Sequence, residues 1–241
     1  MTAPYLPSET IASWGRVVRA SHRVARPRFA DELPGLVSVL GAEEPGLPIG
    51  LRRSYGDSNL NPGGRLIDMT GLDRVIAFDR TAGVMRAEAG LSLSQALQLL
   101  VPAGWFLPTT PGTRFVTLGG AVANAVHGKN HHGAGSFGAS ITRLRLLRTD
   151  GSTHELVPGD PLFHAAIGGL GVTGVIEWVE FRAARIPSSD LDGEDTGFDG
   201  RRRCRPGQDG PLAHVHTVGP SPGTHDEHRD DPTLAFALSR L

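Results

Sequence analysis

Apolar residues spaced three or four positions apart predict three helices in this chain. The pattern covers residues 31–40, 92–100 and 160–167, and this spacing places the apolar side chains on one helix face. Ser92 precedes the second stretch as an N-cap residue, and Asp160 precedes the third, where a proline occupies the first helical position. We therefore expect three short helices.

Short apolar stretches bounded by turn residues predict strands between these helices. The predicted strands cover residues 47–50, 65–69, 74–79, 84–89, 141–148, 153–157 and 175–182. Asp150–Gly151 separates two of them and is a strong signal for a hairpin turn. Because strands and helices alternate irregularly, we expect an α+β fold rather than a doubly wound sheet.

The chain divides into three parts by composition. Residues 1–12 are expected to be a flexible arm, and residues 13–186 hold all of the predicted helices and strands. Residues 187–241 are dense in Asp, Gly, Arg, Pro and His and have no periodic apolar stretch before residues 234–238. Such a segment buries too little apolar surface to offset its ordering entropy, so we expect an irregular, disordered tail.

Composition and charge narrow the range of functions. The 241 residues carry a formal net charge of −1, so no strong attraction to nucleic acid or to an anionic membrane is expected. No apolar run approaches the ~18 residues of a membrane span, and the N-terminus lacks the basic and apolar regions of a secretory signal. A single cysteine, Cys204, excludes an internal disulfide and fits a reducing compartment. We therefore expect a cytoplasmic protein.

The stretch from residue 111 to residue 138 is rich in glycine, contains three histidines and has no acidic residue. Glycine lets the backbone approach a ligand closely and adopt positive φ angles. Backbone N–H groups that are freed in this way are good donors to phosphate oxygens. The stretch therefore predicts a cradle for a large anionic cofactor.

Two neighbouring arginines, Arg52 and Arg53, begin another polar loop, which follows the strand predicted at 47–50. Ser54, Gly56 and Ser58 follow and offer small side chains and free backbone donors. The arginines fit a phosphate clamp, which we favour over the alternative of a solvated surface turn.

The histidines of the glycine-rich stretch leave three interpretations open. His127 and His131 have the spacing of two zinc ligands on a helix, but the glycines around them argue against a helix there. The three histidines, with His132, can instead form hydrogen bonds within a loop, or one can contact a cofactor or substrate. The histidines of the predicted tail are expected to be solvated; they are His214, His216, His225 and His228.

Two other motifs are weaker. Gly169, Gly171 and Gly174 match the GxGxxG fingerprint, but a helix precedes them and a strand follows, which reverses the order of a dinucleotide-binding Rossmann unit. We favour a glycine turn that lets the backbone pass close to a planar ligand. Ser136 lacks the GxSxG context of a hydrolase nucleophile.

Three separated segments agree in sequence and spacing with one known family. They are GLRRSYGDSNLN at 50–61, PGTRFVTLGGAVANAVHGKNHHGAGSFG at 111–138 and GGLGVTGVI at 168–176. Together they resemble the FAD-binding domains of the p-cresol methylhydroxylase (PCMH) type, found in flavoproteins related to vanillyl-alcohol oxidase. SWGR at 13–16 and HGKNHH at 127–132 are similar to the branch of decaprenylphosphoryl-β-D-ribose 2′-oxidases, beside the sugar-lactone and alditol oxidases.

This resemblance implies two α+β subdomains with FAD extended between them. The first pyrophosphate loop would hold Ile49, Gly50, Arg52, Arg53, Ser54, Tyr55, Gly56, Asp57 and Ser58. The second would be lined by Gly112, Thr117, Leu118, Gly119 and Gly120. The resemblance places Asn124, Val126 and His127 near the flavin, and Val175 and Ile176 near the adenine.

The resemblance also implies a reaction. Hydride would pass from a carbinol carbon of a sugar-like or polyol substrate to flavin N5, while a base takes the hydroxyl proton. Tyr55 and His127 would position the substrate. Many relatives bind FAD covalently through a histidine just before the serine of the first loop, where this chain has Arg53. We therefore expect non-covalent FAD.

Members of the family are roughly twice as long as this chain, and their C-terminal half is a substrate domain that covers the flavin. The predicted tail does not resemble that domain, so we expect a truncated form that lacks it. The alternative to an active oxidoreductase is a catalytically incomplete FAD-binding fragment, or a module that needs a partner protein to supply the cap.

Overall fold

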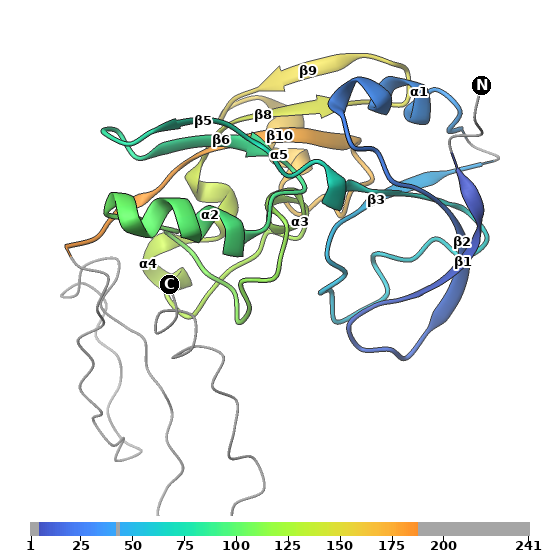
Figure 1. Cartoon of the computed structure of the whole chain (residues 1–241), viewed down its shortest axis with the longest axis horizontal. Helices are drawn as coiled ribbons and strands as arrows, with labels where there is room; N and C mark the ends of the chain where they lie inside the picture. The colour runs from blue at the N-terminus through green and yellow to red at the C-terminus, as the bar shows by residue number, and fades with distance from the viewer. Residues whose placement is uncertain (1–4, 42–43, 188–241) are drawn as a thin grey trace, which may run out of the picture.

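The computed structural model describes residues 5–41 and 44–187, which form two main β-sheets with short helices packed against them (Figure 1). This arrangement confirms the expected α+β class. The predicted tail lies outside the described residues except for Pro187, and so do Cys204 and the tail histidines.

The N-terminal sheet has four strands in the order β1-β2-β4-β3. Its first two strands are antiparallel, and β4 pairs in parallel with both β2 and β3. A 3-10 helix η1 and a short helix α1 follow β2 and replace the single helix predicted over 31–40. The elements are β1 Leu6–Ala12, β2 Arg19–Ala25, η1 Ala30–Glu32, α1 Leu33–Val37, β3 Gly46–Ile49 and β4 Arg65–Asp68.

The prediction of a flexible arm over residues 1–12 was wrong for Leu6–Ala12. These residues form edge strand β1, in which Thr10 pairs with Ser21 of β2. Only Ile11 of this strand is buried. The apolar alternation that identifies a strand in sequence is therefore almost absent, and pairing with β2 is what orders the segment.

The second sheet has five antiparallel strands in the order β5-β6-β10-β8-β9. The hairpin predicted around Asp150–Gly151 is present: Leu147 of β8 pairs with Thr153 of β9, and Gly151 has a φ of 81°. The strands are β5 Val75–Asp79, β6 Val84–Glu88, β8 Ile141–Leu147, β9 Thr153–Leu156 and β10 Val175–Arg182.

The helices of this part of the chain cover the sheet and connect its strands (Figure 1). Ser92 caps α2 as predicted: its hydroxyl accepts a hydrogen bond from the backbone of Gln95. The elements are η2 Met69–Gly71, α2 Leu93–Leu100, η3 Val101–Ala103, β7 Trp105–Phe106, α3 Leu118–Ala123, α4 His131–Ala134, η4 Phe137–Ser140, α5 Pro161–Ala166 and β11 Ala184–Arg185. None of these helices is long and apolar enough to cross a bilayer.

Apolar clusters hold the sheets in place, and one of them, formed by Ile11, Val24, Leu47, Ile49 and Leu66, belongs to the first sheet alone. The largest lies under the five-stranded sheet, where the rings of Phe137 and Phe181 lie 5.5 Å apart. Another joins the two sheets, because Leu147 and Val175 of the second sheet pack with Ile67 of β4 and with Leu36 of α1. Apolar packing therefore fixes the position of the first sheet against the second.

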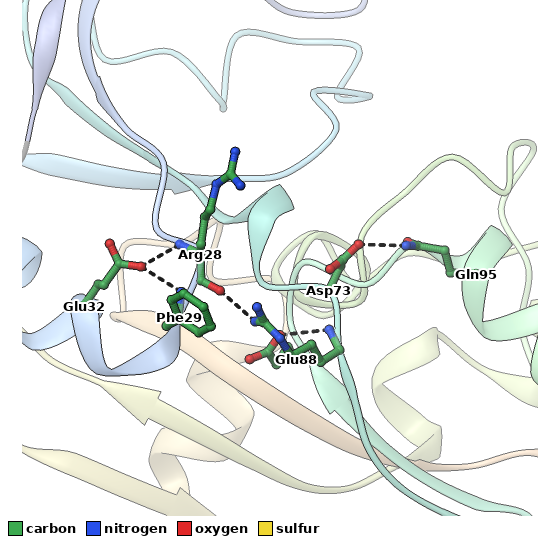
Figure 2. Close-up of polar contacts among 7 residues, drawn as sticks. Arg28, Phe29, Glu32, Asp73, Glu88 and Gln95 are labelled. Atoms are coloured by element: carbon green, nitrogen blue, oxygen red, sulfur yellow. Dashed lines mark hydrogen bonds and ion pairs between the residues drawn. The ribbon is translucent and has the colours of Figure 1, made fainter.

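A set of polar contacts braces the same junction (Figure 2). The Arg74 guanidinium donates to the carbonyl of Arg28, at 2.7 Å, and to the carboxylate of Glu88, at 3.3 Å. The Glu32 carboxylate accepts from the backbone N–H groups of Arg28 and Phe29, both at 2.8 Å. The bond from Arg74 to the Arg28 carbonyl links the segment before β5 to the segment after β2, so a charge-assisted hydrogen bond ties the two parts of the chain as well as packing.

His22 lies in β2 with 1% of its surface exposed, and its Nε2 accepts a hydrogen bond from the backbone N–H of Asn61 at 2.9 Å. Burial lowers the pKa of His22 below its usual value. His22 is therefore protonated more readily in the unfolded chain than in the folded chain. The free energy of unfolding should fall as pH drops below about 6.5.

The variant His22→Gln tests this expectation, because its amide oxygen can accept the Asn61 bond without titrating. Urea unfolding between pH 7.5 and pH 5.0 should show a shallower pH dependence in the variant than in the wild type. If the free energy of unfolding has the same pH dependence in both proteins, groups other than His22 cause the loss of stability in acid.

Candidate functional site

A cleft of about 1030 Å³ lies where the two sheets meet. Its walls come mainly from three stretches: residues 48–59, residues 111–127 and residues 170–176. This volume is at the upper end of the roughly 300–1,000 Å³ that small-molecule and cofactor sites occupy. The cleft therefore has room for a ligand as large as a dinucleotide.

Most of the residues predicted to bind a cofactor line this cleft, although they come from segments that are far apart in the sequence. They are Ile49, Gly50, Arg52, Arg53, Ser54, Tyr55, Gly56, Ser58, Gly112, Thr117, Gly119, Gly120, Asn124, Val126, His127 and Ile176. That these residues bind a ligand stays a prediction.

Three predicted residues do not line the cleft. Asp57 is exposed and accepts a hydrogen bond from the Ser13 hydroxyl at 3.2 Å. Leu118 is fully buried in the core beneath the cleft. Val175 is buried in the apolar cluster that joins the two sheets. Val175 points away from the cleft because neighbouring residues of strand β10 point to opposite faces, and Ile176 takes the cleft side.

The first loop supplies free backbone donors. Within residues 5–41 and 44–187, no protein group accepts a hydrogen bond from the amide N–H groups of residues 52–56. The loop is nevertheless held in place, because the Ser54 carbonyl accepts from the backbone of Trp14 at 3.3 Å. Arg52 has a φ of 58°, a left-handed conformation that few residues other than glycine adopt. A fixed loop with unused N–H groups is an anion-binding arrangement.

Three backbone amides of the glycine-rich second loop are used within the protein. The N–H of Leu118 donates to Leu91 and that of Gly119 donates to Ala89, both at 2.8 Å. The N–H of Gly120 donates to the capping hydroxyl of Thr117 at 3.1 Å. These three amides are already used and do not face a ligand; that other amides of the two loops donate to phosphate stays a prediction.

Several glycines of the cleft have no space for a side chain. A Cβ on Gly50 would lie 2.2 Å from Oγ1 of Thr117, where the first loop touches the second. A Cβ on Gly174 would lie 2.7 Å from the Leu147 carbonyl, and Gly171 and Gly174 both have positive φ. These two glycines belong to the GxGxxG match, and they line the cleft from a turn before β10, not from a Rossmann helix.

The two predicted catalytic residues reach the cleft from different subdomains. Tyr55 comes from the first loop, and 85% of its surface is exposed. His127 follows α3 and is also exposed; its ring lies 5.8 Å from that of His131. An exposed phenol and an exposed imidazole at one cleft can both contact a polar ligand.

A short helix, α4, begins at His131 and does not extend back to His127. His127 precedes that helix, so His127 and His131 do not share one helix face. Among the described residues, no group of three or more His, Cys, Asp or Glu side chains has the proximity needed to hold a metal ion.

Sequence reasoning missed other residues of the cleft. The Asn59 amide lines it and is 92% buried, and neither of its polar atoms has a hydrogen-bond partner among the described residues. Trp14 and Leu170 also line it, and Leu170 has a φ of 52°. Asn59 lies in the motif at 50–61 and Trp14 in SWGR at 13–16, and these motif positions were the sequence features that could have pointed to a role in the site.

The chain matches the family model described as "FAD binding domain" over residues 21–157. It is 37% identical over 207 residues to decaprenylphosphoryl-beta-D-ribose oxidase of Mycolicibacterium smegmatis, covering 82% of this chain and 45% of that protein. It is 26% identical over 173 residues to an alditol oxidase of a Streptomyces species, covering 70% of this chain and 40% of that protein. It is 29% identical over 177 residues to L-gulono-1,4-lactone dehydrogenase of Mycobacterium tuberculosis, covering 73% and 41%. The chain thus spans less than half the length of these relatives.

Proposed function

We propose that this chain, which belongs to the FAD-binding domain family, is the cofactor domain of an oxidoreductase that oxidises a CH–OH group of a sugar-like molecule. Its cofactor is FAD. The observation that carries the proposal is the cleft between the sheets, lined by the first loop, by the glycines of the second and by β10. Relatives named as oxidases or dehydrogenases of a ribose derivative, an alditol and a sugar lactone support the substrate class.

The chemistry of the cleft fits FAD. The unused amides of residues 52–56 can donate to pyrophosphate oxygens, and each such charge-assisted bond contributes about 1.5–3 kcal/mol. Gly50 and Gly174 keep the walls free of side chains, so a planar or extended ligand can lie against the backbone. Asn59 offers a buried amide whose donor and acceptor both lack a partner. An elongated anionic dinucleotide matches this combination of groups.

We propose that the FAD is held without a covalent bond. Arg53 stands where the family resemblance places the histidine that carries flavin in many relatives. A guanidinium stays protonated in proteins and has no free lone pair to form such a bond. Arg53 lies beside the Trp14 ring, with its Cζ 5.0 Å from the ring centroid, where its charge can attract a phosphate.

The residues of the chain would orient the substrate and move its proton. FAD, when bound, supplies a two-electron oxidant that accepts hydride at its N5 atom. His127, as the neutral imidazole, can accept the hydroxyl proton of the substrate at the ring nitrogen that carries no hydrogen. The Tyr55 hydroxyl can donate to a substrate oxygen and fix its orientation.

The alternative is an FAD-binding module that turns over only when another polypeptide covers the cleft. The exposure of Tyr55 at 85% and of Trp14 at 52% favours it, since large aromatic side chains at a ligand site are usually covered in the working state. Both functions require the same bound cofactor, and they differ only in turnover.

The visible absorption of the purified protein, before and after acid precipitation, tests the cofactor assignment. We expect a flavin spectrum that moves completely to the supernatant when the protein precipitates. Flavin that remains in the pellet would contradict non-covalent binding. A colourless protein that takes up no added FAD would contradict the proposed function.

Anaerobic addition of polyols and sugar lactones to the flavin-loaded protein then separates the two functions. Bleaching of the flavin band by any of these alcohols supports an oxidoreductase that works alone. A stable flavin with every alcohol, in a protein that dithionite still reduces, supports the module that needs a cover.

A further inference from the structure

A second cavity, of about 380 Å³, adjoins the proposed FAD cleft. It shares Trp14 and residues 50–53 with that cleft. Its other walls come from the turn between β1 and β2 and from the end of β4, and none of those residues lines the cleft. The two cavities therefore meet at the first loop but have separate surroundings.

Four arginines line the second cavity: Arg16, Arg19, Arg52 and Arg53. In the part of the chain that the structure describes, none of them forms an ion pair with a carboxylate. Other arginines of the same sheet do form such pairs; Arg23 lies 3.1 Å from a Glu44 oxygen, for example. The cavity thus gathers positive charge that no carboxylate of the described residues pairs with.

The single carboxylate on the cavity wall does not alter this balance. Asp68 accepts hydrogen bonds from the Thr70 amide at 3.1 Å and from the Thr70 hydroxyl at 2.7 Å. It also lies 3.6 Å from the Arg26 guanidinium, which is not part of the cavity. Because its charge is already engaged, the guanidinium groups remain available to anions: Arg52 and Arg53 also face the FAD cleft, whereas Arg16 and Arg19 line this cavity alone.

The two loops that carry the arginines are fixed against each other. The N–H of Trp14 donates to the Ser54 carbonyl at 3.3 Å, and the Ser13 hydroxyl donates to the Asp57 carboxylate at 3.2 Å. A Cβ on Gly15 would lie 2.9 Å from the Tyr55 carbonyl, so the backbones touch there. The arginines of both loops are therefore presented together, which lowers the entropy lost on binding.

We propose that this cavity is a second anion site, which binds the phosphoryl group of a small molecule other than FAD. Guanidinium groups match phosphate oxygens in a bidentate geometry, and the two of Arg16 and Arg19, which line this cavity alone, balance the charge of about −2 on a phosphate monoester better than that of a carboxylate. The volume is at the low end for small-molecule sites, enough for a phosphoryl group with part of its molecule but not for a dinucleotide. This inference rests on the proposed function only in assigning the neighbouring cleft to FAD.

Calorimetric titration of the FAD-loaded full chain with inorganic phosphate and with pyrophosphate, at low salt, tests the site. The double variant Arg16→Ala/Arg19→Ala should bind pyrophosphate about tenfold more weakly or worse, because it loses two charge-assisted contacts. The control is Arg28→Ala/Arg80→Ala, which removes the same charge from exposed arginines outside both cavities. Its affinity should match that of the wild type within about twofold.

Three other outcomes would overturn the proposal. Equal pyrophosphate affinity in the double variant and the wild type would mean that Arg16 and Arg19 hold no anion. An equal loss in the control would mean nonspecific attraction to a basic surface. Weaker FAD binding in Arg16→Ala/Arg19→Ala would assign these arginines to the cofactor cradle. If the chain binds no FAD, the proposed function fails, and the same titration of the unloaded protein still decides the anion site.

Discussion

Gly50→Ala is expected to weaken FAD binding by more than about tenfold and to lower the free energy of unfolding by about 1–3 kcal/mol. The new Cβ would lie 2.2 Å from Oγ1 of Thr117 and 3.0 Å from its Cγ2. Gly50 and Thr117 both line the cleft, so the loops must separate or Thr117 must turn away from its capping bond to Gly120. Fluorescence titration with FAD and urea unfolding without FAD measure the two effects separately.

Gly56→Ala is the matched control for this substitution. Gly56 lies in the same loop and lines the same cleft, but a Cβ there would meet no atom within 4 Å. We expect FAD affinity within about twofold of the wild type and a change in stability within about 0.5 kcal/mol. An equal loss in both variants would mean that loop flexibility, rather than the contact with Thr117, controls binding.

A double-mutant cycle makes the contact itself testable. Thr117→Ala removes Oγ1 and Cγ2 and should cost about 1 kcal/mol by itself, because α3 loses its cap. In that background, Gly50→Ala should be less harmful than in the wild type, since the nearest remaining Thr117 atom, Cβ, is 3.1 Å away. Additive losses would show that the two residues do not interact.

Phe181→Ala should destabilise the fold by about 3–5 kcal/mol, the range for removal of a fully buried phenyl ring. Phe181 has no exposed surface, packs on Phe137 at 5.5 Å and lies in β10, between β6 and β8. A loss of this size is a large part of the about 5–15 kcal/mol that stabilises a typical domain. Urea unfolding followed by tryptophan fluorescence measures it.

The effect should extend to the cofactor, because β10 also carries Ile176, which lines the cleft. We therefore expect Phe181→Ala to hold less flavin after purification than the wild type. Ile76→Ala, in edge strand β5 of the same sheet with 49% of its surface exposed, serves as the control and should change stability by about 0.5 kcal/mol or less. Similar losses in the two variants would contradict a core centred on Phe181.

Local patterns in the sequence determined much of the second subdomain. The apolar spacing and Ser92 gave α2 with its cap, and Asp150–Gly151 gave the β8–β9 hairpin. The motifs at 50–61, 111–138 and 168–176 identified the segments that line the cleft. Each of these features depends on residues that are close in sequence, where propensity and turn chemistry act.

Only the tertiary structure decided how those segments serve the site. Strand pairing ordered β1, and the direction of β10 turned Val175 into the core. Carbonyls of Leu91 and Ala89 used the amides of residues 118 and 119, and the Thr117 hydroxyl used that of Gly120. The packing of two loops about 35 residues apart in sequence gathered Arg16, Arg19, Arg52 and Arg53 around one cavity. The sequence shows that each group is present. Contacts between distant segments depend on how the sheets pack, and these contacts decide whether a hydrogen-bond donor or a charge is available to a ligand.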